Sequence, residues 1–168
     1  MFLVGYNTSV LNPVSPYCFP SHSTMEWSFA VSAFAVGGPL GSAMAGTVSG
    51  RLGVKSALQL TLLMFLSSGV LQTFAQDVLG LTVSRALAGL ASGSSTVLVP
   101  LYLGEISPPT IRGTLGTVTQ FSMVIGILFS NVAALALENG KKWRTLFSVT
   151  FFVAGSCFVA ARGWVVER

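Results

Sequence analysis

The chain has 168 residues, of which 52% are hydrophobic and only 8% are charged, and its mean hydropathy is +0.74. A soluble domain usually carries about 25% charged residues, so this composition excludes an ordinary water-soluble globular protein. The net charge is +4, but the nine basic residues are scattered along the chain. They do not form the basic stripe that a nucleic-acid backbone requires, and we expect no nucleic-acid partner.

Five apolar segments are long enough to cross a bilayer, because roughly 20 apolar residues span the hydrocarbon core. They lie near residues 27–50, 56–75, 79–103, 114–137 and 145–161. An earlier apolar segment, 2–11, is too short to span, and the proline-rich stretch 13–23 that follows it is expected to be a loop. The sequence therefore predicts an all-α membrane protein with the lipid bilayer as its environment.

The distribution of Lys and Arg in the loops indicates the orientation, since short cytoplasmic loops carry the excess of these residues. One side of the predicted bundle carries Arg51, Lys55, Arg112, Arg162 and Arg168, and the other carries Lys141, Lys142 and Arg144. Five cations against three favour the first side as cytoplasmic. The loop 13–23 is then extracellular.

Small residues and cysteines have structural interpretations. Within segment 27–50, Gly38, Ser42, Gly46 and Gly50 repeat at every fourth position, and such a stripe is predicted to let a neighbouring helix approach closely. Cys18 and Cys157 are expected to be free thiols. The single histidine, His22, leaves no Cys/His spacing that would hold a metal, and we expect no metal, no cofactor and no catalytic residues.

The segment 84–131 places a short charged island between two membrane-length runs. The island extends from Glu105 to Arg112 and contains a double proline. A charge needs a strong reason to sit between two spanning segments, and the prolines end a helix. We expect a helix, a cytoplasmic turn and a second helix.

The order and spacing of residues across this segment closely resemble the sugar porter family of the major facilitator superfamily. The family's pattern is an Arg-xxx-Gly-xxx-Gly helix, Pro-x-Tyr-x-x-Glu, a proline with Arg-Gly, and a glutamine on the next helix. This chain has Arg85, Gly89, Gly93, Pro100, Tyr102, Glu105, Pro108, Arg112, Gly113 and Gln120 in that order.

The resemblance implies the fold and the function. It covers nearly all of residues 1–168, but only about the N-terminal half of the family's architecture. We therefore expect the N-terminal six-helix bundle of the major facilitator fold, with its first helix truncated and the C-terminal bundle absent. The family's Pro-Glu-Ser-Pro-Arg signature is missing after the sixth segment, where the chain reads ARGWVVER. The implied function is facilitated transport of a monosaccharide (a hexose) by alternating access in the plasma membrane.

The chain is expected to be incomplete on its own, with a C-terminal half or a second copy of itself as a partner. Two other interpretations stay open. One is a proton–sugar symporter, and the other is a non-transporting membrane interaction or sensor protein. Asn7 bears on the symporter interpretation. Proton-coupled members of the family commonly carry Asp at the position of Asn7, whereas facilitators carry Asn. An amide does not exchange a proton near neutral pH, so Asn7 favours uncoupled transport.

Gln120 is the leading candidate for substrate binding, because a primary amide in a spanning helix must find partners or face water. On the same helical face lie Met123, Val124, Ile127 and Asn131. A face with amides at both ends and apolar groups between them suits the hydroxyls and C–H groups of a sugar. In the resembling family this glutamine contacts hexose. The alternative is an interhelical hydrogen bond worth about 1 kcal/mol.

Thr8 is a further candidate for the cavity lining. A bond from its hydroxyl to the backbone carbonyl four residues earlier is an equal alternative.

A set of four charged residues is predicted to act in gating. Its members are Arg51, Glu105, Arg112 and Arg85. The resemblance implies that the loop residues among them form a salt-bridge cluster that holds the outward-open state, and the alternative is simple anchoring of cations on the cytoplasmic side. Val54 stands where the family usually has a further cation, which predicts a weaker gate. Arg85 has no acid nearby in sequence and is expected to pair with carbonyls or polar groups of the first segment.

Overall fold

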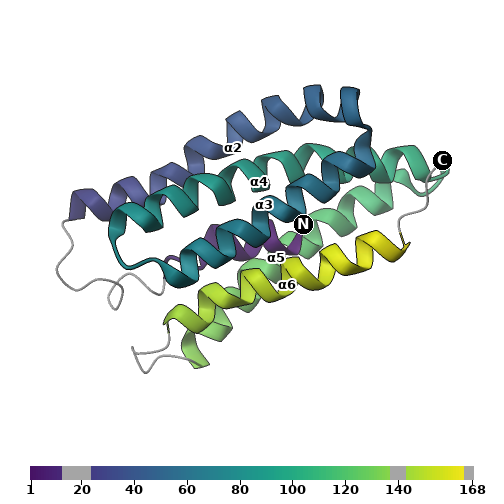
Figure 1. Ribbon diagram of the computed structural model, residues 1–168. Coiled ribbons are helices and arrows are strands. Elements are labelled where there is room, and N and C mark those ends of the chain that lie inside the picture. Colours follow the sequence, from purple (N-terminus) through teal and green to yellow (C-terminus); the bar gives the residue numbers. More distant parts are fainter. Residues whose placement is uncertain (13–23, 137–142, 165–168) are drawn as a thin grey trace.

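The structure is a computed structural model that describes residues 1–12, 24–136 and 143–164, and these residues form six α-helices. The helices are α1 (Phe2–Ser9), α2 (Thr24–Leu52), α3 (Val54–Phe74), α4 (Val78–Ile106), α5 (Arg112–Ala136) and α6 (Trp143–Trp164). The long helices run side by side along one direction (Figure 1). The all-helical fold predicted from the sequence is confirmed in the part of the chain that the structure describes.

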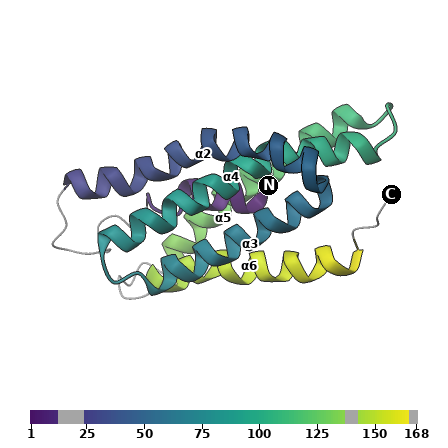
Figure 2. The ribbon, with the colours of Figure 1, turned by 45° about the horizontal axis from the view of Figure 1, so that its top comes forward.

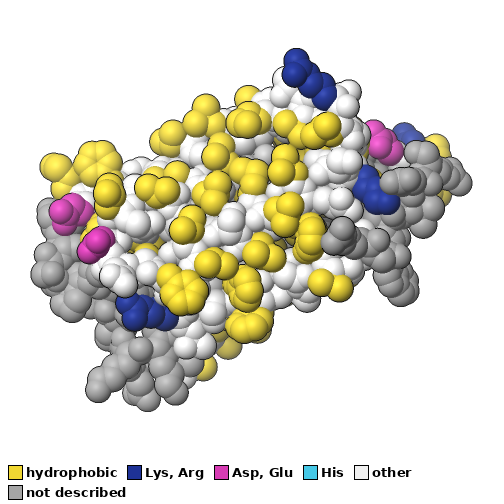
Figure 3. All heavy atoms as spheres, viewed as in Figure 1, with side chains coloured by type: hydrophobic (Ala, Val, Ile, Leu, Met, Phe, Trp, Pro, Cys, Tyr) yellow, Lys and Arg dark blue, Asp and Glu magenta, His cyan; other side chains and the backbone are white. Residues whose placement is uncertain are grey.

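Five of these helices are long and apolar enough to cross a membrane. The candidate spans are Met25–Leu52, Val54–Phe74, Val78–Ile106, Arg112–Ala136 and Arg144–Ala161. Figure 3 shows hydrophobic side chains spread over the middle of one face and charged groups near its two ends. Because hydrocarbon solvates apolar side chains and excludes charges, this distribution is that of a membrane protein.

The first helix is short but buried. α1 has eight residues, compared with 21 in α3 and 29 in α4. Its buried residues are Leu3, Val4, Gly5, Tyr6, Asn7 and Ser9. Two views place α1 inside the bundle, next to α5 (Figures 1 and 2). Polar groups of α1 must therefore find partners on the surrounding helices.

Glycines allow the backbones of α2 and α4 to touch. A Cβ at Gly41 of α2 would meet the Leu90 carbonyl of α4, and a Cβ at Gly93 of α4 would meet the Gly38 carbonyl of α2. The Ser94 hydroxyl donates a hydrogen bond to the Gly41 carbonyl at 3.0 Å across this contact. Small residues permit this close approach, and van der Waals contact with interhelical hydrogen bonding stabilises it in a membrane.

The predicted stripe of small residues on α2 has the right spacing but the wrong register. A Cβ at Gly38, Gly46 or Gly50 would point into open space, whereas one at Gly37 or Gly41 would meet the backbone of α4. Glycine occurs in both registers at positions 37 and 38, so the pattern alone did not distinguish them. A four-residue repeat also drifts by about 40° per step around a helix with 3.6 residues per turn.

α1 and α5 cross at a second pair of glycines. A Cβ at Gly5 would meet the Met123 carbonyl, and one at Gly126 would meet the Phe2 carbonyl. Beside the crossing, the ring of Phe129 lies 5.7 Å from that of Phe2, measured between centroids. This contact positions α1 against the helix that carries the predicted substrate face.

Candidate functional site

The predicted substrate residues of α5 lie together on an open face of the helix. Gln120, Val124 and Asn131 are exposed, and Met123 and Ile127 are half-buried at the edge of the contact with α1. The buried side of α5 consists of other residues, namely Thr119, Gly126, Ser130 and Ala134. The face therefore presents two amides with apolar side chains between them. Its role in substrate binding stays a prediction.

The side chain of Gln120 is exposed on α5. Among the residues that the structure describes, no hydrogen bond to its side chain is formed, although the amide offers two N–H donors and an acceptor oxygen. The alternative interpretation, an interhelical hydrogen bond, finds no support in this part of the chain. The amide is open to a polar partner outside the bundle.

Asn131 is held in a defined orientation by two hydrogen bonds. Ser9 Oγ of α1 donates to Asn131 Oδ1 at 3.2 Å, and Asn131 Nδ2 donates to the Ile127 carbonyl at 2.9 Å. One N–H of the amide is left over. Sequence reasoning missed Ser9, because a serine in an apolar helix commonly bonds its own backbone and nothing in the pattern links residues 9 and 131.

Thr8 of α1 is exposed, but its hydroxyl proton is used within the helix. Thr8 Oγ1 donates to the Val4 carbonyl at 2.7 Å, which is the backbone bond that the sequence left as an alternative. The oxygen lone pairs remain as acceptors. A contact between Thr8 and substrate stays a prediction.

Asn7 and Arg85 meet in the bundle interior, where their side chains are 0% and 2% exposed. Arg85 Nη1 donates to the Asn7 carbonyl at 2.8 Å. Asn7 Nδ2 donates to the Leu3 carbonyl at 3.0 Å and to Thr150 Oγ1 of α6 at 3.4 Å. The guanidinium carbon also lies 4.4 Å from the centroid of the Phe34 ring, a favourable cation–π geometry. Arg85 thus pairs with a carbonyl of the first helix, as its sequence environment led us to expect.

The other charged residues of the predicted gate lie elsewhere. Arg51, Glu105 and Arg112 are exposed and belong to the ends of helices where α2 meets α3 and where α4 meets α5. Arg112 Nε donates to the Ser107 carbonyl at 3.2 Å. Within residues 24–136 no ion pair joins these three side chains, so the salt-bridge cluster stays a prediction. Arg85 and Glu105 are separated by about 30 Å of helix rise, and the structure does not bring Arg85 into this group.

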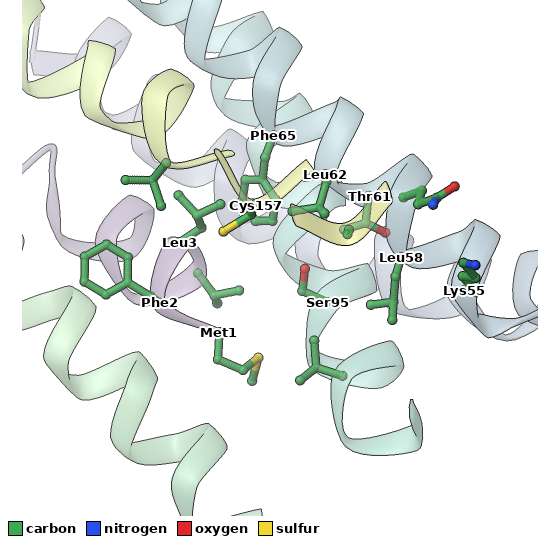
Figure 4. Close-up of a pocket in the computed structure, with 15 residues that line it drawn as sticks. Met1, Phe2, Leu3, Lys55, Leu58, Thr61, Leu62, Phe65, Ser95 and Cys157 are labelled. Atoms are coloured by element: carbon green, nitrogen blue, oxygen red, sulfur yellow. The ribbon is translucent and has the colours of Figure 1, made fainter. Parts of the chain in front are cut away.

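A pocket of about 220 Å³ opens beside the first residues of α1 and is lined by α3, α4 and α6 (Figure 4). Its lining is mostly apolar and includes Phe2, Leu3, Leu58, Leu62 and Phe65. None of the predicted substrate residues lines it, so this pocket is distinct from the α5 face.

Several predicted features lie outside the described residues. They are the loop 13–23 with Cys18 and His22, the cations Lys141 and Lys142, and the terminal Arg168. The side chain of Arg162 is also outside the described set. Cys157 is described, and it is a free, exposed thiol as expected.

Comparison with known proteins identifies the family. The profile of the family described as "Sugar (and other) transporter" matches residues 2–164. The chain belongs to this family of sugar transporters. This sugar porter chain is 33% identical to the facilitated glucose transporter member 5 of solute carrier family 2 from Mus musculus, over 92% of this chain and 35% of the relative. It is 36% identical to plastidic glucose transporter 4 of Arabidopsis thaliana, over 88% of this chain and 28% of the relative.

A solved structure has the same fold as this sugar porter chain. The inward-open xylose transporter XylE from E. coli superposes with a TM-score of 0.87 at 22% identity, over 99% of this chain and 46% of that chain. The matches to the two curated relatives cover 35% and 28% of their lengths, so the chain spans about a third of these proteins. These relatives are named for transport, and the sugar porter chain is a membrane-embedded member of a transporter family.

Proposed function

We propose that this chain forms the N-terminal six-helix bundle of a hexose facilitator in the plasma membrane and contributes half of an alternating-access pathway. The observation that carries the proposal is the open face of α5, on which Gln120 has no described partner and Asn131 is oriented by Ser9. The family membership and the names of the curated relatives support a sugar as substrate. The first helix is expected to be longer in the complete transporter.

A sugar has a surface that matches this face. Its hydroxyls would hydrogen-bond to the amides of Gln120 and Asn131, and its C–H groups would contact Met123, Val124 and Ile127. Each of these residues is exposed or half-buried rather than packed in the bundle. A second wall, supplied by a C-terminal half or by a second copy of the chain, would enclose the substrate and exclude water.

Uptake by a restored transporter tests this function. The chain is joined to the C-terminal half of the mouse relative, reconstituted in vesicles and supplied with labelled glucose, fructose or xylose. Saturable uptake that a competing hexose inhibits supports the proposal. The isolated 168-residue chain serves as the control and is expected to be inactive, because one bundle offers only one wall of a pathway. Uptake by the isolated chain would contradict the incompleteness that we propose.

The restored transporter also separates the alternatives. Facilitated transport predicts equal initial rates with and without a proton gradient, because Asn7 and its neighbour Arg85 form no acid–base pair that exchanges a proton near neutral pH. Rates that depend on the gradient would favour the proton–sugar symporter. Sugar binding without any uptake would favour the non-transporting sensor.

A further inference from the structure

Five buried side chains among the described residues have polar atoms without a hydrogen-bond partner; two are the serines Ser92 and Ser130, and the other three come from three different helices. Those three are Asn7 Oδ1 of α1, Arg85 Nε of α4, and both Nε2 and Oε1 of Gln72 on α3. Gln72 is 0% exposed. Buried polar groups are nearly always hydrogen-bonded in folded proteins, and leaving one unpaired is costly. A complete amide without any partner inside a membrane bundle therefore calls for an explanation.

Gln72 and Arg85 belong to two helices, α3 and α4, that pack against each other. α3 and α4 are antiparallel neighbours joined by a short turn, so residues equally distant from the turn lie level with each other. Ala75 and Leu81 belong to one buried cluster, and Phe65 and Ala91 belong to another. Gln72 lies near the end of α3 and Arg85 lies about two turns into α4, so both belong to the part of this helix pair next to the turn.

The packing of α3 against α6 places Gln72 in the same part of the bundle as Asn7. A Cβ at Gly69, about one turn from Gln72, would lie 2.8 Å from the backbone nitrogen of Phe151. The residue before Phe151 is Thr150, which accepts the hydrogen bond from Asn7. Gln72 is buried about one helical turn from this contact, in the same part of the bundle as Thr150 and Asn7.

We propose that Gln72, Asn7 and Arg85 form a buried water-binding site in the interior of the bundle. Two of the unpaired groups are donors, Arg85 Nε–H and the Gln72 amide N–H, and two are acceptors, Asn7 Oδ1 and Gln72 Oε1. A water molecule both donates and accepts, and buried waters typically make about three hydrogen bonds to such groups. An anion would satisfy only the donors, and a metal cation would satisfy only the acceptors.

This site explains how the bundle holds a guanidinium without a carboxylate. The acids within the described residues, Glu26, Asp77 and Glu105, are all exposed, so none of them compensates the buried charge of Arg85. The amide of Gln72 and the bound water supply oriented dipoles in place of an acid. Gln72 is therefore a positioning residue, because it holds Arg85 where its Nη1 bonds the carbonyl of Asn7 and ties α1 to α4.

A double-mutant cycle on thermal unfolding tests the coupling of Gln72 to Arg85. The 168-residue chain is purified in detergent as the parent, as Gln72→Leu, as Arg85→Met and as the double variant. We expect Gln72→Leu to lower Tm by about 3–8 °C when Arg85 is present, and to leave Tm unchanged or raise it in the Arg85→Met background. An equal shift in both backgrounds overturns the proposal. Should Arg85→Met not fold, Arg85→Lys removes Nε and completes the same cycle.

A matched control and a direct observation complete the test. Gln59→Leu changes a half-buried glutamine of the same helix and should shift Tm equally in both backgrounds. Replacing chloride by gluconate should leave Tm unchanged. A chloride-dependent Tm would show that the site binds an anion and would overturn the proposal that it binds water. A density map that resolves waters should show one within hydrogen-bonding distance of Gln72 and Arg85. A direct bond between these two side chains, with no water between them, would refute the site.

Discussion

Ser9 and Asn131 are 122 residues apart in sequence and share a hydrogen bond of 3.2 Å, in which the serine hydroxyl donates to the amide oxygen. The bond joins α1 to the open face of α5. It also fixes the orientation of the Asn131 amide, because the oxygen accepts from Ser9 while one N–H is left over. The proposed sugar site is therefore built by two helices, although the residues predicted for it lie mostly on one.

Gln120→Leu should weaken apparent sugar affinity in the restored transporter. Leucine has nearly the same volume but cannot hydrogen-bond, and a substrate hydroxyl left unpaired costs roughly 1–3 kcal/mol, which is about five- to a hundredfold in affinity. The measurement is KM for hexose uptake, with membrane insertion checked by surface labelling. Gln59→Leu lies away from the α5 face and should leave KM unchanged. If Gln120→Leu inserts normally and its KM is unaltered, Gln120 does not contact the sugar.

Ser9→Ala should have a smaller effect on the same KM. The variant releases the Asn131 oxygen, so the amide can rotate and its donor is no longer held toward the substrate. A neutral hydrogen bond contributes about 1 kcal/mol, and we expect KM to rise by roughly two- to tenfold. If Asn131 contacts sugar through its N–H, Ser9→Ala in an Asn131→Ala background should add nothing further. Additive losses in the double variant would show that the two residues act independently.

Gly41→Ala and Gly46→Ala should have opposite effects, although both change a glycine of α2 to alanine. The added methyl group at Gly41 meets the Leu90 carbonyl, whereas the one at Gly46 has open space. Overpacking at Gly41 should cost about 1–3 kcal/mol, and the better helix propensity of alanine should stabilise the Gly46 variant by up to about 1 kcal/mol. Thermal unfolding in detergent measures both. Equal behaviour of the two variants would mean that α2 and α4 do not touch at Gly41.

Cysteine labelling should place the turn between α4 and α5 in the cytoplasm. In a chain with Cys18 and Cys157 replaced, a cysteine at Thr110 is expected to resist an impermeant reagent added outside intact cells. A cysteine at Ser21, which lies outside the described residues, should react. The expectation rests on the excess of cations at the ends that carry Arg51, Lys55 and Arg112. The reverse labelling pattern would invert the topology.

The sequence was sufficient to predict the helices, because membrane-length apolar runs and the double proline after Glu105 are strong local signals. It also indicated that Arg85 would seek a carbonyl of the first helix, since a buried cation without a nearby acid has few other partners. The helix predictions depend only on the sequence of each helix by itself. The Arg85 prediction depends only on the need of a buried charge for a polar partner.

Features that depend on how two helices are rotated against each other could not be predicted. On α2 the Cβ positions that face α4 are those of Gly37 and Gly41 rather than those of Gly38 and Gly46, and both registers contain glycine. Ser9 and Gln72 were missed for a related reason. Each is an ordinary polar residue in an apolar helix, and only the packing shows that one faces Asn131 and the other lies in the interior.

The burial of α1 has a consequence for how the protein is made. Tyr6 of this helix donates a hydrogen bond of 2.7 Å to the carbonyl of Leu146, and Asn7 donates one to Thr150. At a synthesis rate of about 5–20 residues per second, the ribosome needs roughly 7–28 seconds to add the 140 residues that separate Tyr6 from Leu146. During that interval the polar groups of the first helix lack their final partners. The polar contacts that hold α1 in the bundle can therefore form only after α6 has been synthesised.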